Sequence, residues 1–323
     1  MKIVDFHCDT ISQLYDIRES GESINLKQNR LHLDIEKMKK GDYMLQVFAS
    51  YVDLGSNNKP LESCLSYIDL LYDEVEKNKE HIGIVYNYED ILTNIKKNKM
   101  SALLSIEEGG VCNGNLSLLR NFYRLGVRMM TLTWNYENEL AYPNGYFYDE
   151  EENERKGLKE KGFEFINEME RLGIIIDVSH LSDDGIYDVY NNTSKPFIAS
   201  HSNAREVCSH QRNLTDDMIK KIGERGGLIG VNFYSSFLNN NYKSSDTSKI
   251  EDIINHIKYI SNTGGIDCVG IGSDFDGIDC SLEFENSSKM QLIYGEMKKL
   301  GFREEDIEKV FYKNAIRLFK ELL

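Results

Sequence analysis

The sequence predicts an α/β protein built as a (β/α)8 TIM barrel. Short apolar, β-branched runs alternate with longer amphipathic segments along the whole chain, which is the pattern of parallel strands joined by helices. There are eight such runs, and eight parallel strands close a barrel. The length of 323 residues suits one barrel with several long loops. We therefore expect a single barrel domain over residues 1–323.

The eight predicted strands are each short enough to be buried on both faces. They are Lys2–Phe6, Tyr43–Phe48, Ala102–Ile106, Val127–Thr133, Ile174–Ser179, Pro196–Ser200, Leu228–Phe233 and Cys268–Gly272. Amphipathic periodicity is strongest in Leu158–Leu172 and Ile250–Ile260, where we expect helices of the outer ring. Ser182 and Thr215 are predicted helix caps, because each precedes a pair of aspartates. The predicted helix ends are Gly126, Gly173, Gly226 and Gly264.

Long connections follow strands 1, 4 and 7 of this pattern. They are Thr10–Gly41, Asn135–Arg155 and Tyr234–Lys249. Loops after barrel strands surround the catalytic mouth, so Tyr142–Tyr146 and Ser235–Ser248 are candidate lids or oligomer contacts. The polar stretch Asn239–Ser248 is equally typical of a solvated insertion.

Composition describes a globular protein and excludes some partners. The chain is 41% hydrophobic and 28% charged, and it has no apolar run of membrane-spanning length. Its net charge of −15 argues against nucleic acid or an anionic membrane as partner, since both require clusters of Lys and Arg. The N-terminus reads directly as a strand, without the features of a secretory signal, and the cysteines show no CxxC spacing. We expect a cytoplasmic protein with reduced thiols.

Metal-binding and polar side chains gather at the ends of the predicted strands. In chain order they are His7, Asp9, Glu107, Trp134, Asn135, His180, His201, Tyr234 and Asp274. Each signal is weak by itself, because an isolated histidine is more often a hydrogen-bonded structural residue. The carboxyl ends of barrel strands converge on one face, however, so residues far apart in sequence become neighbours. The joint pattern therefore predicts one shared site.

Imidazoles and carboxylates without a thiolate suit Zn²⁺, or Mn²⁺ as the alternative. His7, Asp9, Glu107, His180 and His201 offer five ligands. Five is too many for one tetrahedral catalytic ion with an open position, but it suits two ions bridged by a carboxylate. Water held by such ions loses a proton near pH ~7. The predicted chemistry is metal-assisted hydrolysis of an amide or ester.

Several sequence blocks resemble those of the membrane dipeptidase (renal dipeptidase) family, peptidase family M19. The blocks are Val4–Asp9, Leu104–Glu107, Leu132–Asn135, Asp177–Ser182, Ser200–Ala204, Gln211–Leu214, Val231–Tyr234 and Gly272–Gly277, and the match runs in order from residue 3 to about residue 320. The resemblance implies a bacterial-type, soluble, amidohydrolase-like zinc barrel that cleaves dipeptides, and it implies a homodimer. It also implies that His7 and Asp9 hold one Zn²⁺, that His180 and His201 hold the other, and that Glu107 bridges them.

The resemblance further implies that Asp274 handles the proton of the bridging water and that Arg212 binds the carboxylate of the substrate. A guanidinium suits this task because it pairs bidentately with a carboxylate and keeps its charge. Tyr234 is a candidate lining residue, although core or loop packing explains it equally well. Trp134 stands where mammalian members of the family have a histidine that helps to stabilise the charged tetrahedral intermediate of the reaction. Indole donates one hydrogen bond but carries no charge. Either the metal and Asn135 stabilise that intermediate here, or Trp134 only shapes an aromatic wall.

Two assignments stay open at the level of sequence. Glu108 adjoins Glu107, and Glu107 is preferred because it directly follows the strand. Asp276 lies two residues beyond Asp274, which is preferred because it comes first after the buried run.

Two other functions also fit the pattern. A related barrel could hydrolyse a lactam, an ester or another amide, because fold does not decide function. A barrel without turnover could bind a small ligand, although the presence of all five ligands and Asp274 argues against it.

Overall fold

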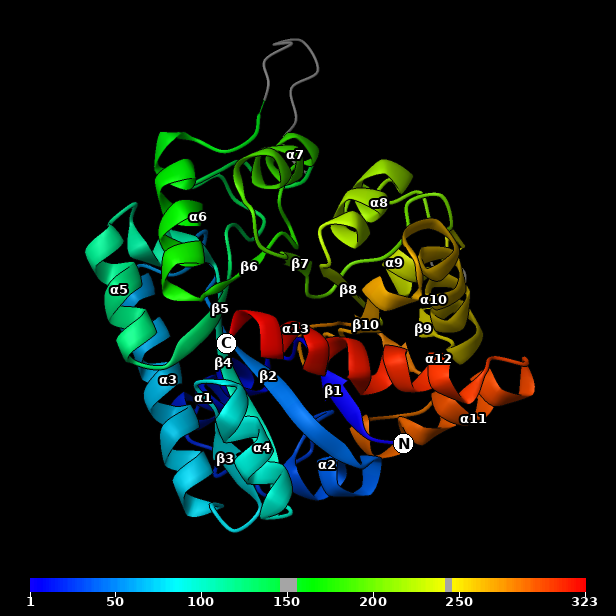
Figure 1. Cartoon of the computed structure of the whole chain (residues 1–323). Coiled ribbons are helices and arrows are strands. Elements are labelled where there is room, and N and C mark those ends of the chain that lie inside the picture. Colours follow the sequence, from blue (N-terminus) through cyan, green and yellow to red (C-terminus); the bar gives the residue numbers. More distant parts are fainter. Residues whose placement is uncertain (146–155, 242–245) are drawn as a thin grey trace.

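The computed structural model describes residues 1–145, 156–241 and 246–323. Eight parallel strands form a closed barrel in the order β2-β1-β10-β8-β7-β6-β5-β4, and pairing of β2 with β4 closes the ring (Figure 1). The barrel strands are β1 (Ile3–Asp5), β2 (Tyr43–Tyr51), β4 (Met100–Glu107), β5 (Val127–Thr131), β6 (Ile175–Asp177), β7 (Ile198–Ala199), β8 (Leu228–Val231) and β10 (Val269–Ile271). The predicted (β/α)8 fold is confirmed, since each predicted run contains or overlaps one of these strands.

Three short strands were not predicted. The strand β3 (Ile82–Ile84) pairs with the first residues of β4, on the edge that β5 occupies further along. The strands β9 (Thr247–Ser248) and β11 (Ser281–Leu282) form a separate two-stranded sheet. Segments of two or three residues are too short for an alternating pattern to show.

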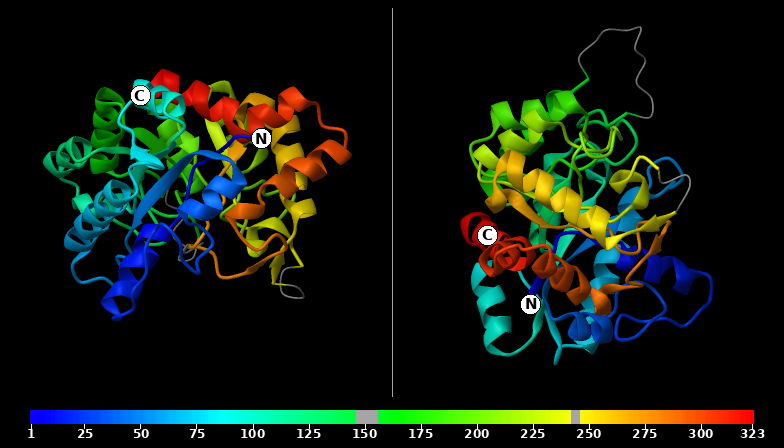
Figure 2. Two further views of the ribbon diagram at one scale, coloured as in Figure 1. Left: turned by 90° about the horizontal axis from the view of Figure 1, so that it is seen from below. Right: turned by 90° about the vertical axis from the view of Figure 1, so that its right-hand side faces the viewer.

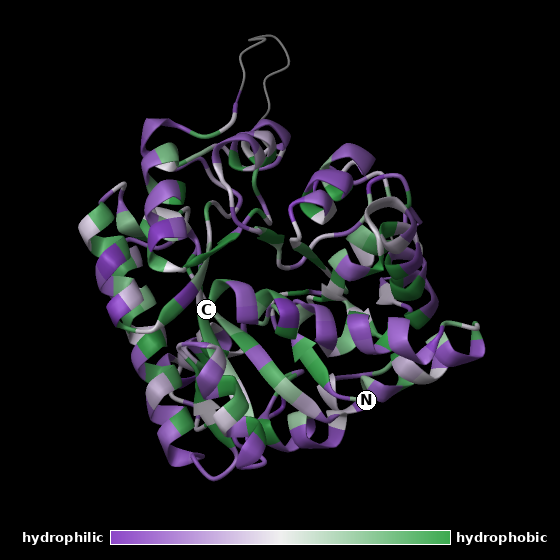
Figure 3. Cartoon of the chain, viewed as in Figure 1, coloured by the Kyte–Doolittle hydropathy of each residue, from purple (hydrophilic) through white to green (hydrophobic). Residues whose placement is uncertain are grey.

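Helices surround the barrel, and their apolar faces turn inward while polar faces turn outward (Figure 3). The α-helices are α1 (Thr10–Glu19), α2 (Ile35–Gly41), α3 (Pro60–Lys77), α4 (Tyr88–Lys96), α5 (Leu116–Arg124), α6 (Glu160–Leu172), α7 (Asp183–Asn192), α8 (Asp216–Glu224), α9 (Ser235–Leu238), α10 (Ile250–Gly264), α11 (Gln291–Lys299), α12 (Glu304–Glu308) and α13 (Asn314–Leu322). Short 3₁₀ turns occupy Gly109–Cys112, Ile266–Cys268 and Ser287–Lys289, and a π-helical turn, Lys309–Lys313, precedes α13.

The predicted helix caps are largely confirmed. The side chains of Ser182 and Thr215 accept hydrogen bonds from backbone N–H groups in the first turns of α7 and α8. Gly173 caps α6 in the left-handed conformation, with φ 81°. One predicted end was wrong by a residue, because Gly264 is the last residue of α10 and Gly265 is its cap.

Two of the long connections contain regular structure. Thr10–Gly41 holds α1 and α2, and Tyr234–Lys249 holds α9 and β9. Residue 146 of the first proposed lid and residues 242–245 of the second lie outside the described residues, and so do residues 147–155 of the connection Asn135–Arg155. Among the helices of the described ranges, none has both the length and the apolar character needed to cross a bilayer.

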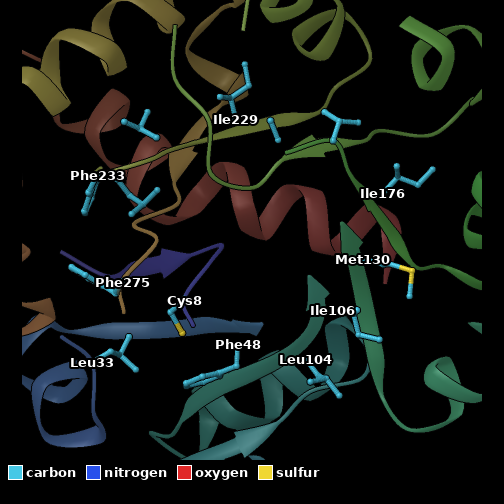
Figure 4. Packing of buried hydrophobic residues seen from close by; sticks show 14 of the residues in the cluster. Cys8, Leu33, Phe48, Leu104, Ile106, Met130, Ile176, Ile229, Phe233 and Phe275 are labelled. Atoms are coloured by element: carbon cyan, nitrogen blue, oxygen red, sulfur yellow. The ribbon is translucent and has the colours of Figure 1, made fainter. Parts of the chain in front are cut away.

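Two apolar clusters hold the barrel together. Leu103 belongs to the cluster inside the barrel. The next residue, Leu104, packs in the cluster between the strands and the outer helices (Figure 4). This alternation follows from the two-residue repeat of a strand. The helix α13 crosses one end of the barrel, on the side where both termini lie, and its Phe319 ring packs 5.4 Å from that of Phe6 (Figure 2). That end is filled, so the opposite face, where the strands end, is the one available for a site.

Candidate metal centre

The five predicted ligands meet at the carboxyl ends of four strands. Glu107 is the last residue of β4, and the others follow β1, β6 and β7 by a few residues. Ligand atoms of His7, Asp9 and Glu107 lie within 4.8 Å of one another, and so do those of Glu107, His180 and His201. Glu107 therefore belongs to both groups. All five side chains are buried.

The first group surrounds the imidazole of His7. Its Nε2 atom lies 3.0 Å from Glu107 Oε2 and 3.5 Å from Asp9 Oδ2, and the Asp274 carboxylate is 3.9 Å away. Both ring nitrogens of His7, Asp9 Oδ1 and Glu107 Oε1 are buried without a hydrogen-bond partner in the structure. Buried polar atoms are rarely left in this state, because each costs about 1–3 kcal/mol. A bound cation would satisfy the carboxylate oxygens and one of the two ring nitrogens.

The second group brings together atoms that carry lone pairs. His180 Nδ1 lies 2.8 Å from Asn135 Oδ1, which only accepts, so Nδ1 carries the proton and Nε2 is free to act as a ligand. His201 Nε2 lies 3.0 Å from His180 Nε2 and 3.4 Å from Glu107 Oε1. Three potential ligand atoms thus converge on one point, an arrangement that a positive ion between them stabilises.

The electrostatics of the centre also favour cations. Within the described residues, the carboxylates of Asp9, Glu107 and Asp274 form no ion pair with Lys or Arg. Burial by itself lowers the pKa of His7, but Glu107 and Asp9 raise it well above its usual value, so positive charge is attracted to this point. Burial lowers the pKa of His180 to about 4, which keeps its ring in the neutral form that binds metals.

Space is left beside the carboxylates. A Cβ atom at Gly277 would lie 2.0 Å from Asp9 Oδ2 and 2.5 Å from Asp274 Oδ1, so only glycine fits there. The side chains therefore fit divalent cations, since they offer imidazole and carboxylate ligands of the kind that Zn²⁺ takes, and Glu107 is common to both groups.

The two carboxylates of the Glu107-Glu108 pair point to different surroundings. Glu108 accepts hydrogen bonds from Gly110 N at 2.7 Å and Trp134 N at 2.8 Å, and also from the Asn138 side chain. It joins the loops that follow β4 and β5 and belongs to neither ligand group, whereas Glu107 belongs to both.

Asp274 and Asp276 differ in the same way. Asp276 accepts hydrogen bonds from Thr10 Oγ1 and His32 N, both at 2.6 Å, and so faces the loop before α2. Asp274 faces the cluster, and its Oδ2 atom accepts a hydrogen bond of 2.8 Å from Asn232 Nδ2. Both aspartates have positive φ, 62° and 68°, a conformation that is strained for residues other than glycine. His180 shares it, with φ 67°, and such strain is typical of functional sites.

Arg212 lies beside the cluster as a buried cation. Its Nη1 donates to Ser202 Oγ at 3.2 Å and its Nη2 to the carbonyl of His201 at 3.4 Å, whereas Nε has no partner. The described residues provide no carboxylate that pairs with it. Burial lowers the pKa of Arg212 to about 10, so it still carries its charge at neutral pH. An incoming anion would complete its pairing.

The remaining predicted residues lie around this centre. The indole of Trp134 packs against Tyr51 at 5.0 Å and lies 6.1 Å from the His180 ring, measured between ring centroids. Asn135 contacts His180 directly. The ring of Tyr234 packs on Phe237, whose ring lies 5.6 Å from the Arg212 guanidinium.

Sequence reasoning assigned no role to Asp177, Asn232 or Phe237. Asp177 and Asn232 are buried polar residues at the ends of β6 and β8, and they contact the residues beside or within the ligand groups. Their position in otherwise apolar strands was a usable signal. The sequence around Phe237 carries no comparable signal, because only the turn of α9 brings its ring close to Arg212.

Comparison with known proteins gives a consistent result. The sequence model of the family described as membrane dipeptidase (peptidase family M19) matches residues 1–322. An uncharacterized dipeptidase of Schizosaccharomyces pombe is 32% identical over 307 residues, covering 90% of this chain and 72% of the yeast protein. The dipeptidase AC, a metallopeptidase of family M19, superposes with a TM-score of 0.92 at 25% identity, covering 100% and 98% of the two chains.

A metallopeptidase from Rhodobacter sphaeroides, solved with a phosphinate mimic of the dipeptide L-Ala-D-Ala, superposes with a TM-score of 0.91. The superposition covers 100% of this chain and 99% of that one at 24% identity, and it shows the shared fold. Because the family match spans nearly the whole chain and includes all the residues of the ligand groups, this protein belongs to the membrane dipeptidase family, peptidase family M19.

Proposed function

We propose that the protein is a zinc-dependent dipeptidase, in which two Zn²⁺ ions share Glu107. The observation that carries the proposal is the convergence of buried ligand atoms from four strand ends on two adjacent points, where atoms of His7, Asp9 and Glu107 have no hydrogen-bond partner. Family membership supports the same activity. Mn²⁺ has the same ligand preferences and is the alternative metal.

His7 and Asp9 would hold one ion, and His180 and His201 the other. When bound, the ions would polarise the scissile carbonyl and make a water molecule more acidic. Asp274 would accept a proton from that water and return it to the leaving amine, because its carboxylate faces the ligand groups and is held by Asn232. Asn135 would keep His180 in its ligating tautomer.

Arg212 would bind the terminal carboxylate of the dipeptide. Its burial without an ion-pair partner among the described residues supports this role, since a buried guanidinium is stabilised by an anion. The rings of Trp134 and Tyr51 form an aromatic wall beside His180, where a substrate side chain would pack. The homodimer and the cytoplasmic location stay predictions from sequence and family resemblance.

Metal content and activity test the proposal together. We expect about two equivalents of zinc in active protein, hydrolysis of unblocked dipeptides, and loss of activity on chelation that Zn²⁺ restores. Full activity after complete removal of metal, or no hydrolysis of any dipeptide in a broad panel with Zn²⁺ supplied, would exclude a zinc dipeptidase.

Arg212 separates the dipeptidase from the alternative of an ester or lactam hydrolase. In Arg212→Ala, kcat/KM for dipeptides should fall by about 30-fold or more, because one partner of a buried charge pair is lost. Arg212→Lys keeps the charge but lacks the planar guanidinium, so its kcat/KM should lie between those of Arg212→Ala and the unaltered protein. Amides or esters without a free carboxylate should be hydrolysed by Arg212→Ala as by the unaltered protein. An equal loss for both substrate types would contradict the assignment of Arg212 to the carboxylate.

A further inference from the structure

A fully buried carboxylate lies behind the metal centre. Asp177 is the last residue of β6 and has no exposed surface. Four donors point to it: Ser179 N at 3.0 Å and Ser200 N at 2.8 Å bond Oδ1, while Thr131 Oγ1 at 2.7 Å and Ser200 Oγ at 2.5 Å bond Oδ2. A carboxylate accepts about four hydrogen bonds, so this one is fully satisfied.

Ser200 connects this carboxylate to a predicted metal ligand. Its Oγ atom lies 2.8 Å from Nδ1 of His201. Because the single hydroxyl hydrogen of Ser200 is donated to Asp177, its oxygen has only lone pairs left for the imidazole. His201 Nδ1 must therefore donate to Ser200, and the neutral ring then has its lone pair on Nε2, the atom that faces Glu107 and His180.

We propose that Asp177 is a positioning residue which, through Ser200, holds His201 in the tautomer whose Nε2 binds the second cation. This inference rests on the proposed metal centre. The inference goes beyond the ligands of that centre, because Asp177 touches neither the cation nor the substrate. A ligand imidazole that is fixed in this way loses no free energy to tautomer exchange when the ion binds.

The chain contains a matched arrangement without an imidazole. Asp5 ends β1 and accepts hydrogen bonds from Ser273 N at 2.9 Å and Ser273 Oγ at 2.6 Å. An Asp and a Ser thus join neighbouring strand ends at two places in the barrel. Of the two serines, only Ser200 also contacts a ring nitrogen. Both Asp–Ser pairs therefore join strands, but only Asp177 and Ser200 also orient an imidazole.

Asp177→Asn tests the inference with a defined outcome. The backbone N–H groups of Ser179 and Ser200 can only donate, so the amide oxygen must take the place of Oδ1 and the NH₂ group the place of Oδ2. That NH₂ group would donate to Ser200, whose hydroxyl would then donate to His201 Nδ1. The proton of the imidazole should move to Nε2, which turns the ligand atom into a donor.

Two measurements without substrate read this change. In metal-free protein labelled with [¹⁵N]histidine, His201 should be protonated on Nδ1, and in Asp177→Asn on Nε2. Titration of metal-free protein with Zn²⁺ against a chromophoric chelator should show the second equivalent bound about 10- to 100-fold more weakly in Asp177→Asn. Circular dichroism establishes that the variant is folded.

Thr131→Val is the matched control, because it removes the other hydroxyl from the same Asp177 oxygen at nearly constant shape. It should leave the tautomer and the zinc affinity close to those of the unaltered protein, and Ser273→Ala should do the same. If Asp177→Asn does not fold, Ser200→Ala takes its place, since it removes the acceptor of Nδ1 and should mix the tautomers and weaken zinc binding.

Retention of the Nδ1 proton and of the zinc affinity in Asp177→Asn, or in Ser200→Ala where that variant replaces it, would overturn the inference. Equal weakening in Thr131→Val would also overturn it, because packing alone would then explain the effect. Failure of the unaltered protein to hydrolyse dipeptides would refute the proposed function and leave the tautomer result standing.

Discussion

Glu107 and Glu108 show how neighbouring identical side chains acquire different roles. Glu107 lies between three imidazoles, with Oε2 3.0 Å from His7 Nε2 and Oε1 3.0 Å from His180 Nε2. Glu108 turns away because its backbone has φ 150°, and its carboxylate accepts hydrogen bonds only from loop groups. The first is suited to bind ions and the second to hold two loops together.

Substitution by glutamine should separate these roles. Glu107→Gln should stay folded but lose most of its zinc and activity, because it removes the one carboxylate that belongs to both ligand groups. In Glu108→Gln an amide NH₂ must face either Trp134 N or Gly110 N, so we expect a loss of about 1–3 kcal/mol in stability. Metal analysis and urea denaturation of both variants measure the two effects. Equal zinc loss in both would contradict the division of roles.

At the scale of elements, the helices that follow barrel strands begin at capped ends that sequence identified. Thr215 precedes α8, and its Oγ1 accepts a hydrogen bond from Met218 N at 3.4 Å, while Asp216 and Asp217 occupy the first turn. A capping oxygen and negative charge at this end satisfy free N–H groups and oppose the helix dipole.

Loss of the cap should cost a measurable amount of stability. Thr215→Ala should lower the free energy of unfolding by about 0.5–2 kcal/mol, because the N–H of Met218 loses its acceptor. Thr215→Ser keeps the oxygen and should stay within a few tenths of a kcal/mol of the original. The midpoints of urea denaturation compare the two, and an identical midpoint for Ala and Ser would show that the cap contributes nothing.

At the scale of the whole molecule, a buried histidine joins segments that are far apart in sequence. His256 of α10 accepts a hydrogen bond from Ala204 N through Nδ1 at 3.1 Å, and its Nε2 lies 3.1 Å from the carbonyl of Leu238 in α9. This pairing needs the neutral ring, and burial lowers the pKa of His256 to about 4.

The stability of the protein should therefore contain a pH-dependent part from His256. The unfolded chain binds a proton at this histidine near pH ~6.5, whereas the folded chain binds it near pH 4, so this part is fully present above pH ~6.5 and is lost as the pH falls toward 4. In His256→Gln the unfolding midpoint should fall less steeply over that range. Denaturation of both proteins across the pH series measures the difference, and parallel curves would contradict it.

Much of the fold was predictable because its signals are local. Eight buried strands appear as short apolar runs, since strands covered on both faces need apolar side chains throughout. The helices α1 and α2 were not predicted: α1 carries only a weak apolar stripe, and α2 is short, so both depend on packing against the barrel. Regions with few local signals take their structure from tertiary contacts.

Short apolar runs predicted the eight strands and the polar residues at their ends, because burial on two faces dictates composition residue by residue. Closure of the barrel decided the rest. It brought Glu107 rather than Glu108 and Asp274 rather than Asp276 into the ligand groups, and it set Asp177 behind Ser200 and His201. The direction of a side chain at a strand end depends on backbone angles and neighbours from other strands, and no single stretch of sequence contains that information.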